Sequence, residues 1–144
     1  MKRAARRPRA RPRRPPGLAE IARLARAARE RAHAPFSGYK VGAALRATSG
    51  EVVTGCNVEN ASYGLTLCAE RVAVFKAVSE GMRGFEAIAV VVDSARPAAP
   101  CGPCRQILWE FCGDIWVRME NLRGRGVTRR MSTLLPMPFD QASL

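Results

Sequence analysis

Two cysteines separated by two residues, Cys101 and Cys104, stand at the start of a predicted helix. Residues three apart on a helix lie on one face, so both thiols can point to the same place. The positive end of the helix dipole favours the thiolate, which is the form that binds a metal or attacks a disulfide. The spacing therefore predicts either a metal site or a redox-active dithiol.

A third cysteine, Cys68, begins another predicted helix and is followed at once by Glu70 and Arg71. Three thiolates would leave the fourth position of a tetrahedral zinc ion open to water, as in catalytic sites, and would acidify that water toward hydroxide. Glu70 could reach the water without being a ligand. Three thiolates outweigh the charge of zinc, and Arg71 and the helix N-termini would offset the excess. Arg105 either assists in this or is an ordinary surface residue.

The redox alternative comes from the tetrapeptide Cys101-Gly102-Pro103-Cys104, which also resembles the redox site of thioredoxins. Thioredoxins have an aromatic residue before the first cysteine, at the end of a buried strand. Here 97–100 precedes it, a Pro-rich stretch that predicts a loop. A dithiol would also give no role to Cys68 and Glu70. Zinc therefore accounts for more of the pattern.

Hydrophobic periodicity predicts the elements that must position these residues. The predicted elements are, in chain order, a helix from Leu18 that ends before Pro35, a hairpin of strands 41–48 and 51–56, a helix over 67–81, a buried strand over 87–92, a helix over 102–112, strands over 115–119 and 126–131, and an extended tail from 134. The order predicts an α/β fold, in which helices pack on the faces of a mixed sheet of about five strands.

The length and composition indicate one ordinary globular domain, with 144 residues of which 47% are hydrophobic and 25% charged. No apolar run approaches the roughly 18 residues that span a bilayer, and no apolar segment of a secretory signal follows the basic N-terminus. We therefore predict a cytoplasmic protein without membrane contact. In that compartment thiols stay reduced, which favours metal or redox chemistry for the five cysteines.

The formal net charge of +12 resides mostly in residues 1–16, which hold eight basic side chains and no acidic one. Residues 17–144 carry a net charge of only +4. An Arg/Pro-rich tract cannot bury apolar surface, so we predict a disordered tail over 1–16 and a catalytic domain over 17–144. The tail could bind nucleic acid through counterion release. We favour the plainer interpretation, a solvated extension or an over-extended start of translation.

The residues that carry chemistry resemble those of one enzyme family. Zinc deaminases contain a His or Cys, any residue and Glu, followed later by Pro-Cys-x-x-Cys. Cys68-Ala69-Glu70 and Pro100-Cys101-Gly102-Pro103-Cys104 match this pattern in its all-cysteine form. Over residues 18–144 the chain is similar to the short, homotetrameric cytidine deaminases. Further matching segments are 34–37, 41–44, 55–63, 68–71, 101–106 and 134–136 with Phe139.

This resemblance implies a three-layer α/β fold with one Zn²⁺ per subunit. It also implies hydrolytic deamination of cytidine and deoxycytidine to uridine and deoxyuridine, with release of ammonia, in pyrimidine salvage. The implied zinc ligands are Cys68, Cys101 and Cys104. A zinc-bound hydroxide would attack C4 of the base while Glu70 moves a proton to N3 and then to the departing amine.

The resemblance also implies a nucleoside pocket completed across subunits. Asn57 and Glu59 resemble the pair that hydrogen-bonds the ribose hydroxyls, and backbone groups of Ala69 and Pro100 the groups that read the base edge. Tyr39 stands where the family usually has a phenylalanine stacked on the pyrimidine. Three further residues, Ala61, Tyr63 and Phe139, resemble those that a neighbouring subunit contributes.

Other functions stay open at this point. A related deaminase could act on a nucleoside antibiotic such as blasticidin S or on nucleic acid, and a zinc-stabilised nucleic-acid-binding module would do no chemistry. The pair Asn57 and Glu59 suits a free ribose, which favours a nucleoside substrate.

Overall fold

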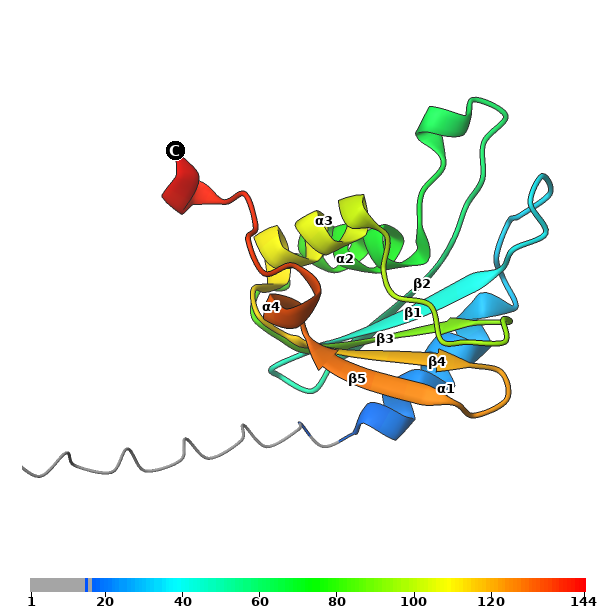
Figure 1. Cartoon of the computed structure of the whole chain (residues 1–144), viewed down its shortest axis with the longest axis horizontal. Helices are drawn as coiled ribbons and strands as arrows, with labels where there is room; N and C mark the ends of the chain where they lie inside the picture. The colour runs from blue at the N-terminus through cyan, green and yellow to red at the C-terminus, as the bar shows by residue number, and fades with distance from the viewer. Residues whose placement is uncertain (1–14, 16) are drawn as a thin grey trace, which may run out of the picture.

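Five strands form a single mixed sheet in the order β2-β1-β3-β4-β5 (Figure 1). The computed structural model describes residues 15 and 17–144. The predictions for the Arg/Pro-rich tail over 1–16 therefore lie almost wholly outside the described residues. The strands are β1 (Val41–Ala47), β2 (Val52–Cys56), β3 (Phe85–Val92), β4 (Trp116–Asn121) and β5 (Gly126–Arg130). Only the central pair, β3 and β4, is parallel; the other neighbouring pairs are antiparallel.

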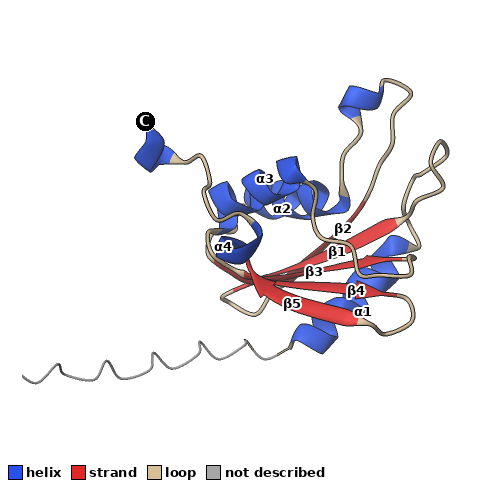
Figure 2. Cartoon of the chain, viewed as in Figure 1, coloured by secondary structure: helices blue, strands red, loops and turns tan. Residues whose placement is uncertain are grey.

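Helices cover both faces of the sheet (Figure 2). Helix α1 (Leu18–Arg29) packs on one face, and α2 (Ala69–Ser79), α3 (Gly102–Cys112) and the single turn α4 (Met131–Leu134) pack on the other. Successive strand residues point to opposite faces, so Ala87 and Ala89 contact the α1 layer whereas Ile88 faces the other helices. The predicted three-layer α/β fold is therefore confirmed, including the strand buried on both faces.

The chain directly after β5 forms a helical turn, where the sequence predicts a strand that reaches residue 131 and an extended tail from 134. Residues 131–134 form the turn α4, because the Asp114 carboxylate accepts a hydrogen bond from the Ser132 N–H at 2.8 Å and the Arg105 guanidinium donates to the Leu134 carbonyl at 2.7 Å. These partners come from distant parts of the chain, so local pattern does not reveal them. Within the described residues, no helix is long and apolar enough to cross a membrane.

Close approach of helix to sheet depends on glycine in two strands. A Cβ atom at Gly42 would lie 1.9 Å from the Ala25 carbonyl oxygen of α1. One at Gly55 would lie 2.5 Å from the Ala69 carbonyl oxygen and 2.6 Å from the Ala73 nitrogen, both in the backbone of α2. Gly55 therefore lets the first turn of α2 settle directly on β2.

We expect Gly55→Ala to force α2 away from the sheet, because the clash is with backbone and no side chain can turn aside. The free energy of unfolding should fall by about 1–3 kcal/mol, the usual cost of overpacking. Urea denaturation measures this. Gly64→Ala is the matched control, since nothing lies within 4 Å of a Cβ at that position. Equal stability of the two variants would contradict the packing argument.

Candidate active site

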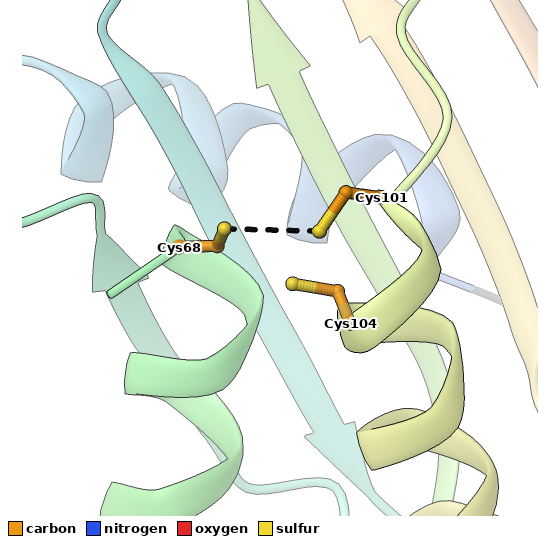
Figure 3. A group of neighbouring side chains, drawn as sticks. All are labelled: Cys68, Cys101 and Cys104. Carbon is orange, nitrogen blue, oxygen red and sulfur yellow. Dashed lines mark hydrogen bonds between the residues drawn. The ribbon is translucent and has the colours of Figure 1, made fainter. Parts of the chain in front are cut away.

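The N-termini of α2 and α3 meet on the same side of the sheet, and this places three thiols together. Cys68 immediately precedes α2, Cys101 immediately precedes α3, and Cys104 lies in the first turn of α3 (Figure 3). Their sulfur atoms all lie within 4.8 Å of one another, and those of Cys68 and Cys101 are 3.9 Å apart. Thiolates bound tetrahedrally to zinc at about 2.3 Å are separated by about 3.8 Å. The three cysteines therefore fit one zinc ion.

Arg71 stands beside this cluster and favours the thiolate of Cys68. Its guanidinium donates to the Cys68 sulfur at 3.5 Å and to the Thr66 carbonyl at 3.1 Å. Hydrogen bonds from the Cys104 thiol and from Arg71 lower the pKa of Cys68 to about 5, although burial opposes the shift. The Arg71 Nε atom is buried and has no hydrogen-bond partner within the described part of the chain. A guanidinium that bonds a sulfur and keeps a spare buried donor suits a site that holds excess negative charge.

Glu70 lies one residue into α2 and is only 5% exposed. Its side chain lines a cavity of about 320 Å³ together with Cys68 and Cys101. Burial raises the pKa of Glu70 to about 7, and the nearby Cys68 thiolate acts in the same direction. A carboxyl group with a pKa near neutrality can both take up and release a proton under physiological conditions. The thiol cluster and a proton carrier thus open into one space.

Three of the predicted nucleoside contacts, Tyr39, Asn57 and Glu59, line the same cavity. Asn57 is 8% exposed; its Oδ1 accepts from the Val41 N–H and its Nδ2 donates to the Tyr39 carbonyl, each at 2.8 Å. The Glu59 carboxylate accepts from the Ser37 hydroxyl and from the N–H groups of Phe36 and Ser37. Both side chains therefore hold the segment that carries Tyr39 against the cavity.

The hydrogen bond from the Ser37 hydroxyl lowers the pKa of Glu59; desolvation opposes this shift, and the backbone N–H groups of Phe36 and Ser37 add to it. The Glu59 side chain is therefore a carboxylate at neutral pH and can only accept hydrogen bonds.

The other two predicted contacts, Ala69 and Pro100, are buried and their side chains do not line the cavity. The Pro100 carbonyl accepts a hydrogen bond from the Arg105 Nε at 2.7 Å. Arg105, for which the sequence left two roles open, joins this carbonyl to that of Leu134. It thus fastens the loop before α3 to α4. A carbonyl keeps a second lone pair after one hydrogen bond, so the Pro100 carbonyl can still accept a bond from a ligand. Its contact with the base stays a prediction.

The residues expected from a neighbouring subunit, Ala61, Tyr63 and Phe139, are exposed and lie outside the cavity. Tyr63 is 75% exposed and Phe139 63%. Tyr63 lines a second hollow, which shares Ser37, Glu59 and Thr66 with the main cavity. A single chain does not bring these three residues to the pocket, and their role across an interface stays a prediction.

Some cavity residues were not singled out from the sequence. Ser37, Thr66 and Ala98 line the cavity, as do Val90 and Val92 of β3. Ser37 lies in the matching segment 34–37, which could have pointed to it. The valines have the pattern of any buried strand, so no signal distinguishes them from core residues.

A fold of this kind, with three thiols and a buried carboxyl at the junction of two helix N-termini, defines a zinc-dependent deaminase. Comparison with known proteins agrees with this class. Residues 18–119 match the family described as "Cytidine and deoxycytidylate deaminase zinc-binding region". The chain belongs to this cytidine and deoxycytidylate deaminase family, whose cofactor is zinc.

Individual relatives are similar over most of their length. A cytidine deaminase from Halalkalibacterium halodurans is 54% identical over 113 residues, which cover 78% of this chain and 86% of the relative. A crystal structure of cytidine deaminase from Burkholderia pseudomallei has a TM-score of 0.83 and 47% identity, covering 85% of this chain and 98% of that one. A blasticidin-S deaminase from Bacillus cereus is 33% identical over 109 residues, which cover 70% of this chain and 77% of the relative.

We expect Cys68→Ser, Cys101→Ser and Cys104→Ser each to lose the bound zinc, since each removes one of three thiolates. Zinc per chain, measured by atomic emission, should fall from about one to near zero. The unfolding temperature should also lose its sensitivity to a chelator, because metal binding contributes to folding. Cys56→Ser and Cys112→Ser are matched controls away from the cluster and should keep their zinc. A zinc-free control would mean that another thiol set holds the metal.

Proposed function

We propose that the protein hydrolyses cytidine and deoxycytidine to uridine and deoxyuridine, with release of ammonia. The observation that carries this proposal is that Glu70, two of the three clustered thiols and the pair Asn57 and Glu59 line one cavity. Its volume of about 320 Å³ lies at the small end of sites for organic ligands. A free nucleoside suits such a space.

Cys68, Cys101 and Cys104 would hold the zinc. Bound zinc supplies a Lewis acid that lowers the pKa of water toward neutrality. Arg71 and the two helix N-termini offset the negative charge of the thiolates, which preserves the electrophilic character of the ion. The soft sulfur donors also favour zinc over magnesium or calcium.

Glu70 would carry protons between water and the base. As a carboxylate it accepts a proton from the attacking water and delivers it to N3 of the pyrimidine. It then takes a second proton from the hydroxyl newly formed at C4 and passes it to the amino group there; the C4–N bond breaks, ammonia leaves and a carbonyl remains at C4. The burial that raises its pKa to about 7 suits a group that must act first as a base and then as an acid.

Asn57 and Glu59 would hydrogen-bond the ribose hydroxyls. The Asn57 amide uses one N–H and one lone pair on the backbone, which leaves one of each for a ligand. The Tyr39 ring would stack on the pyrimidine, and backbone groups of Ala69 and Pro100 would read its edge. The partly exposed Tyr39 side chain leaves room for its hydroxyl to be solvated.

We also propose a homotetramer in which Ala61, Tyr63 and Phe139 complete the pocket of a neighbouring subunit. The exposed rings of Tyr63 and Phe36, which pack edge to face, support this, since exposed apolar side chains that lie together often mark an interface. Pyrimidine salvage is the corresponding role. Because the site needs reduced thiols, we place the enzyme in the cytoplasm.

Blasticidin S is the second candidate substrate, because a deaminase named for it is among the relatives. Its similarity is lower than that of the cytidine deaminases, at 33% identity against 54%. Single-stranded nucleic acid is a weaker candidate because the cavity is small. We therefore rank nucleosides first.

We expect Glu70→Gln to retain zinc and to lower kcat for cytidine by at least about 10³-fold, since an amide cannot carry the proton. Ammonia release is measured with cytidine, deoxycytidine, blasticidin S and single-stranded DNA. Glu80→Gln, at the exposed end of the same helix, is the matched control and should keep its activity. Near-normal turnover by Glu70→Gln would refute the proton-transfer role, and turnover of blasticidin S alone would refute the proposed substrate.

We expect inactive subunits to complement one another if Phe139 serves a neighbouring pocket. Glu70→Gln and Phe139→Ala chains, unfolded together and refolded as mixtures, would form hybrid oligomers with some pockets in which both residues are intact. Mixtures should then exceed the activity of either variant alone, and light scattering reports the oligomer mass. Separately refolded chains, combined afterwards, are the control. A monomeric wild-type protein with full activity would contradict the shared pocket.

A further inference from the structure

Asn121, the last residue of β4, is fully buried and lies outside the cavity. Its side chain makes four hydrogen bonds. The Nδ2 group donates to the carbonyls of Ser94 at 3.0 Å and Ala95 at 3.3 Å, and Oδ1 accepts from the N–H groups of Arg123 at 3.1 Å and Arg125 at 2.9 Å. Two donors and two accepting lone pairs are all that a primary amide offers.

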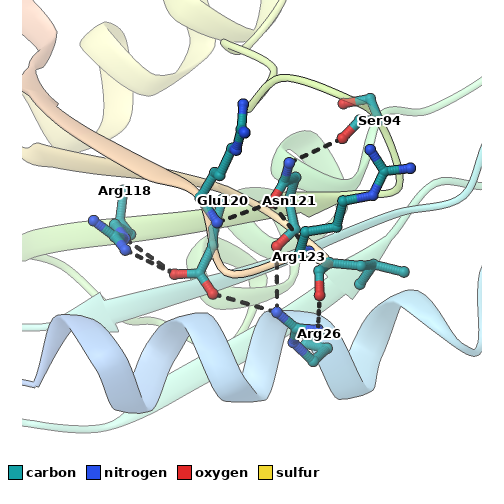
Figure 4. Close-up of polar contacts among 8 residues, drawn as sticks. Arg26, Ser94, Arg118, Glu120, Asn121 and Arg123 are labelled. Atoms are coloured by element: carbon teal, nitrogen blue, oxygen red, sulfur yellow. Dashed lines mark hydrogen bonds and ion pairs between the residues drawn. The ribbon is translucent and has the colours of Figure 1, made fainter.

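These contacts join two loops that leave the same edge of the sheet. Strands β3 and β4 are parallel and Val92 pairs with Asn121, so the segment after β3 and the turn after β4 start side by side. Figure 4 shows the Asn121 side chain lying between Ser94 on the first loop and Arg123 on the second. The first loop, residues 93–100, leads directly to Cys101.

This first loop forms part of the candidate active site. Ala98, Ala99 and Cys101 line the cavity. Within residues 17–144, the only hydrogen bonds that join 93–99 to other segments are the two from Asn121. The other end of the loop is fastened by Arg105, which donates to the Pro100 carbonyl. The loop is thus held at its two ends by one residue each.

The two halves of the Asn121 amide do different work. The Oδ1 atom closes the turn that contains Arg123 and Arg125, as an asparagine or aspartate commonly does at a turn. Only the Nδ2 group reaches the loop of the active site. An aspartate would keep the turn but would present an oxygen to two carbonyl oxygens, which repel it.

We infer that Asn121 is a positioning residue for the active site, whose Nδ2 group fixes the loop 93–100 and thereby places Cys101 and the cavity wall at Ala98 and Ala99. The inference rests on the proposed zinc site but not on the identity of the substrate. Residues that hydrogen-bond a metal ligand directly commonly change metal affinity 10- to 100-fold when they are lost. Asn121 acts on Cys101 through the backbone of the loop, so we expect an effect at the lower end of that range.

The test compares zinc-loaded Asn121→Asp with zinc-loaded Glu120→Gln. The first keeps the side-chain size and the acceptor and loses the donor. The control alters the neighbouring residue, whose carboxylate binds Arg26 and Arg118 rather than the loop. Zinc release to a chromogenic chelator, urea unfolding, and kcat and KM for cytidine are measured. We expect zinc release at least about tenfold faster in Asn121→Asp, with a lower kcat/KM, and within about twofold of wild type in Glu120→Gln.

A second measurement on the wild-type chain keeps the test decisive if Asn121→Asp does not fold. Coupling between two sites is reciprocal, so zinc bound at Cys101 should in turn strengthen the Asn121 hydrogen bonds. Hydrogen exchange of the Asn121 Nδ2 protons, which bond the loop, should therefore become faster when a chelator removes the zinc. The amide of Thr48, bonded to Gly84 at the opposite edge of the sheet, is the internal control.

Two results would overturn the inference alone: zinc release from Asn121→Asp that matches the Glu120→Gln control, or exchange of the Asn121 Nδ2 protons that does not change when the zinc is removed. A wild-type chain that binds no zinc would instead refute the zinc site, and the inference with it. A zinc-loaded chain that deaminates no cytidine would refute the proposed function and leave the zinc-release comparison valid.

Discussion

The negative charge that three clustered thiolates bring to a bound zinc is the constraint on which the rest of the site depends. Three thiolates carry more charge than a divalent ion cancels, so they are tolerable only where the surroundings are positive. The N-termini of α2 and α3 supply partial positive charge, because Cys68 and Cys101 each directly precede a helix. Arg71 adds a full charge at 3.5 Å from the Cys68 sulfur. The convergence of two helices is therefore an electrostatic requirement as well as a geometric one.

The same convergence explains the unusual environment of Glu70. The tight seat of α2 on β2, which Gly55 permits, buries the first turn of the helix. Glu70 is therefore withdrawn from water beside a thiolate, and both effects raise its pKa to about 7. An isolated buried carboxyl would be a cost to the fold. Here the same burial gives Glu70 a pKa that suits both roles proposed for it, uptake of a proton from water and release of a proton to the base.

Much of this arrangement could be predicted from the sequence, because its signals are local. The spacing of Cys101 and Cys104, and the position of Cys68 next to Glu70 and Arg71, are short motifs that can be recognised before the fold is known. The positions of Arg105 and Asn121 depend on partners far away in the sequence. A lone arginine after a cysteine and an asparagine at a strand end have common surface and turn roles, so neither stands out before the fold is known. The turn α4 was missed for the same reason, since Asp114 and Arg105 hold it from a distance.

The residues predicted to contact the ribose also have a structural role. Asn57 and Glu59 bond the backbone of Tyr39, Val41, Phe36 and Ser37, so the groups proposed to meet the sugar also order the segment that would meet the base. Loss of either side chain would then affect both parts of the nucleoside at once. A ribose hydroxyl that bonds the spare N–H or lone pair of Asn57 would polarise the bonds already made to the backbone, because chains of hydrogen bonds strengthen one another. The proposed sugar recognition and base stacking would in this way be coupled through the backbone of residues 36–41.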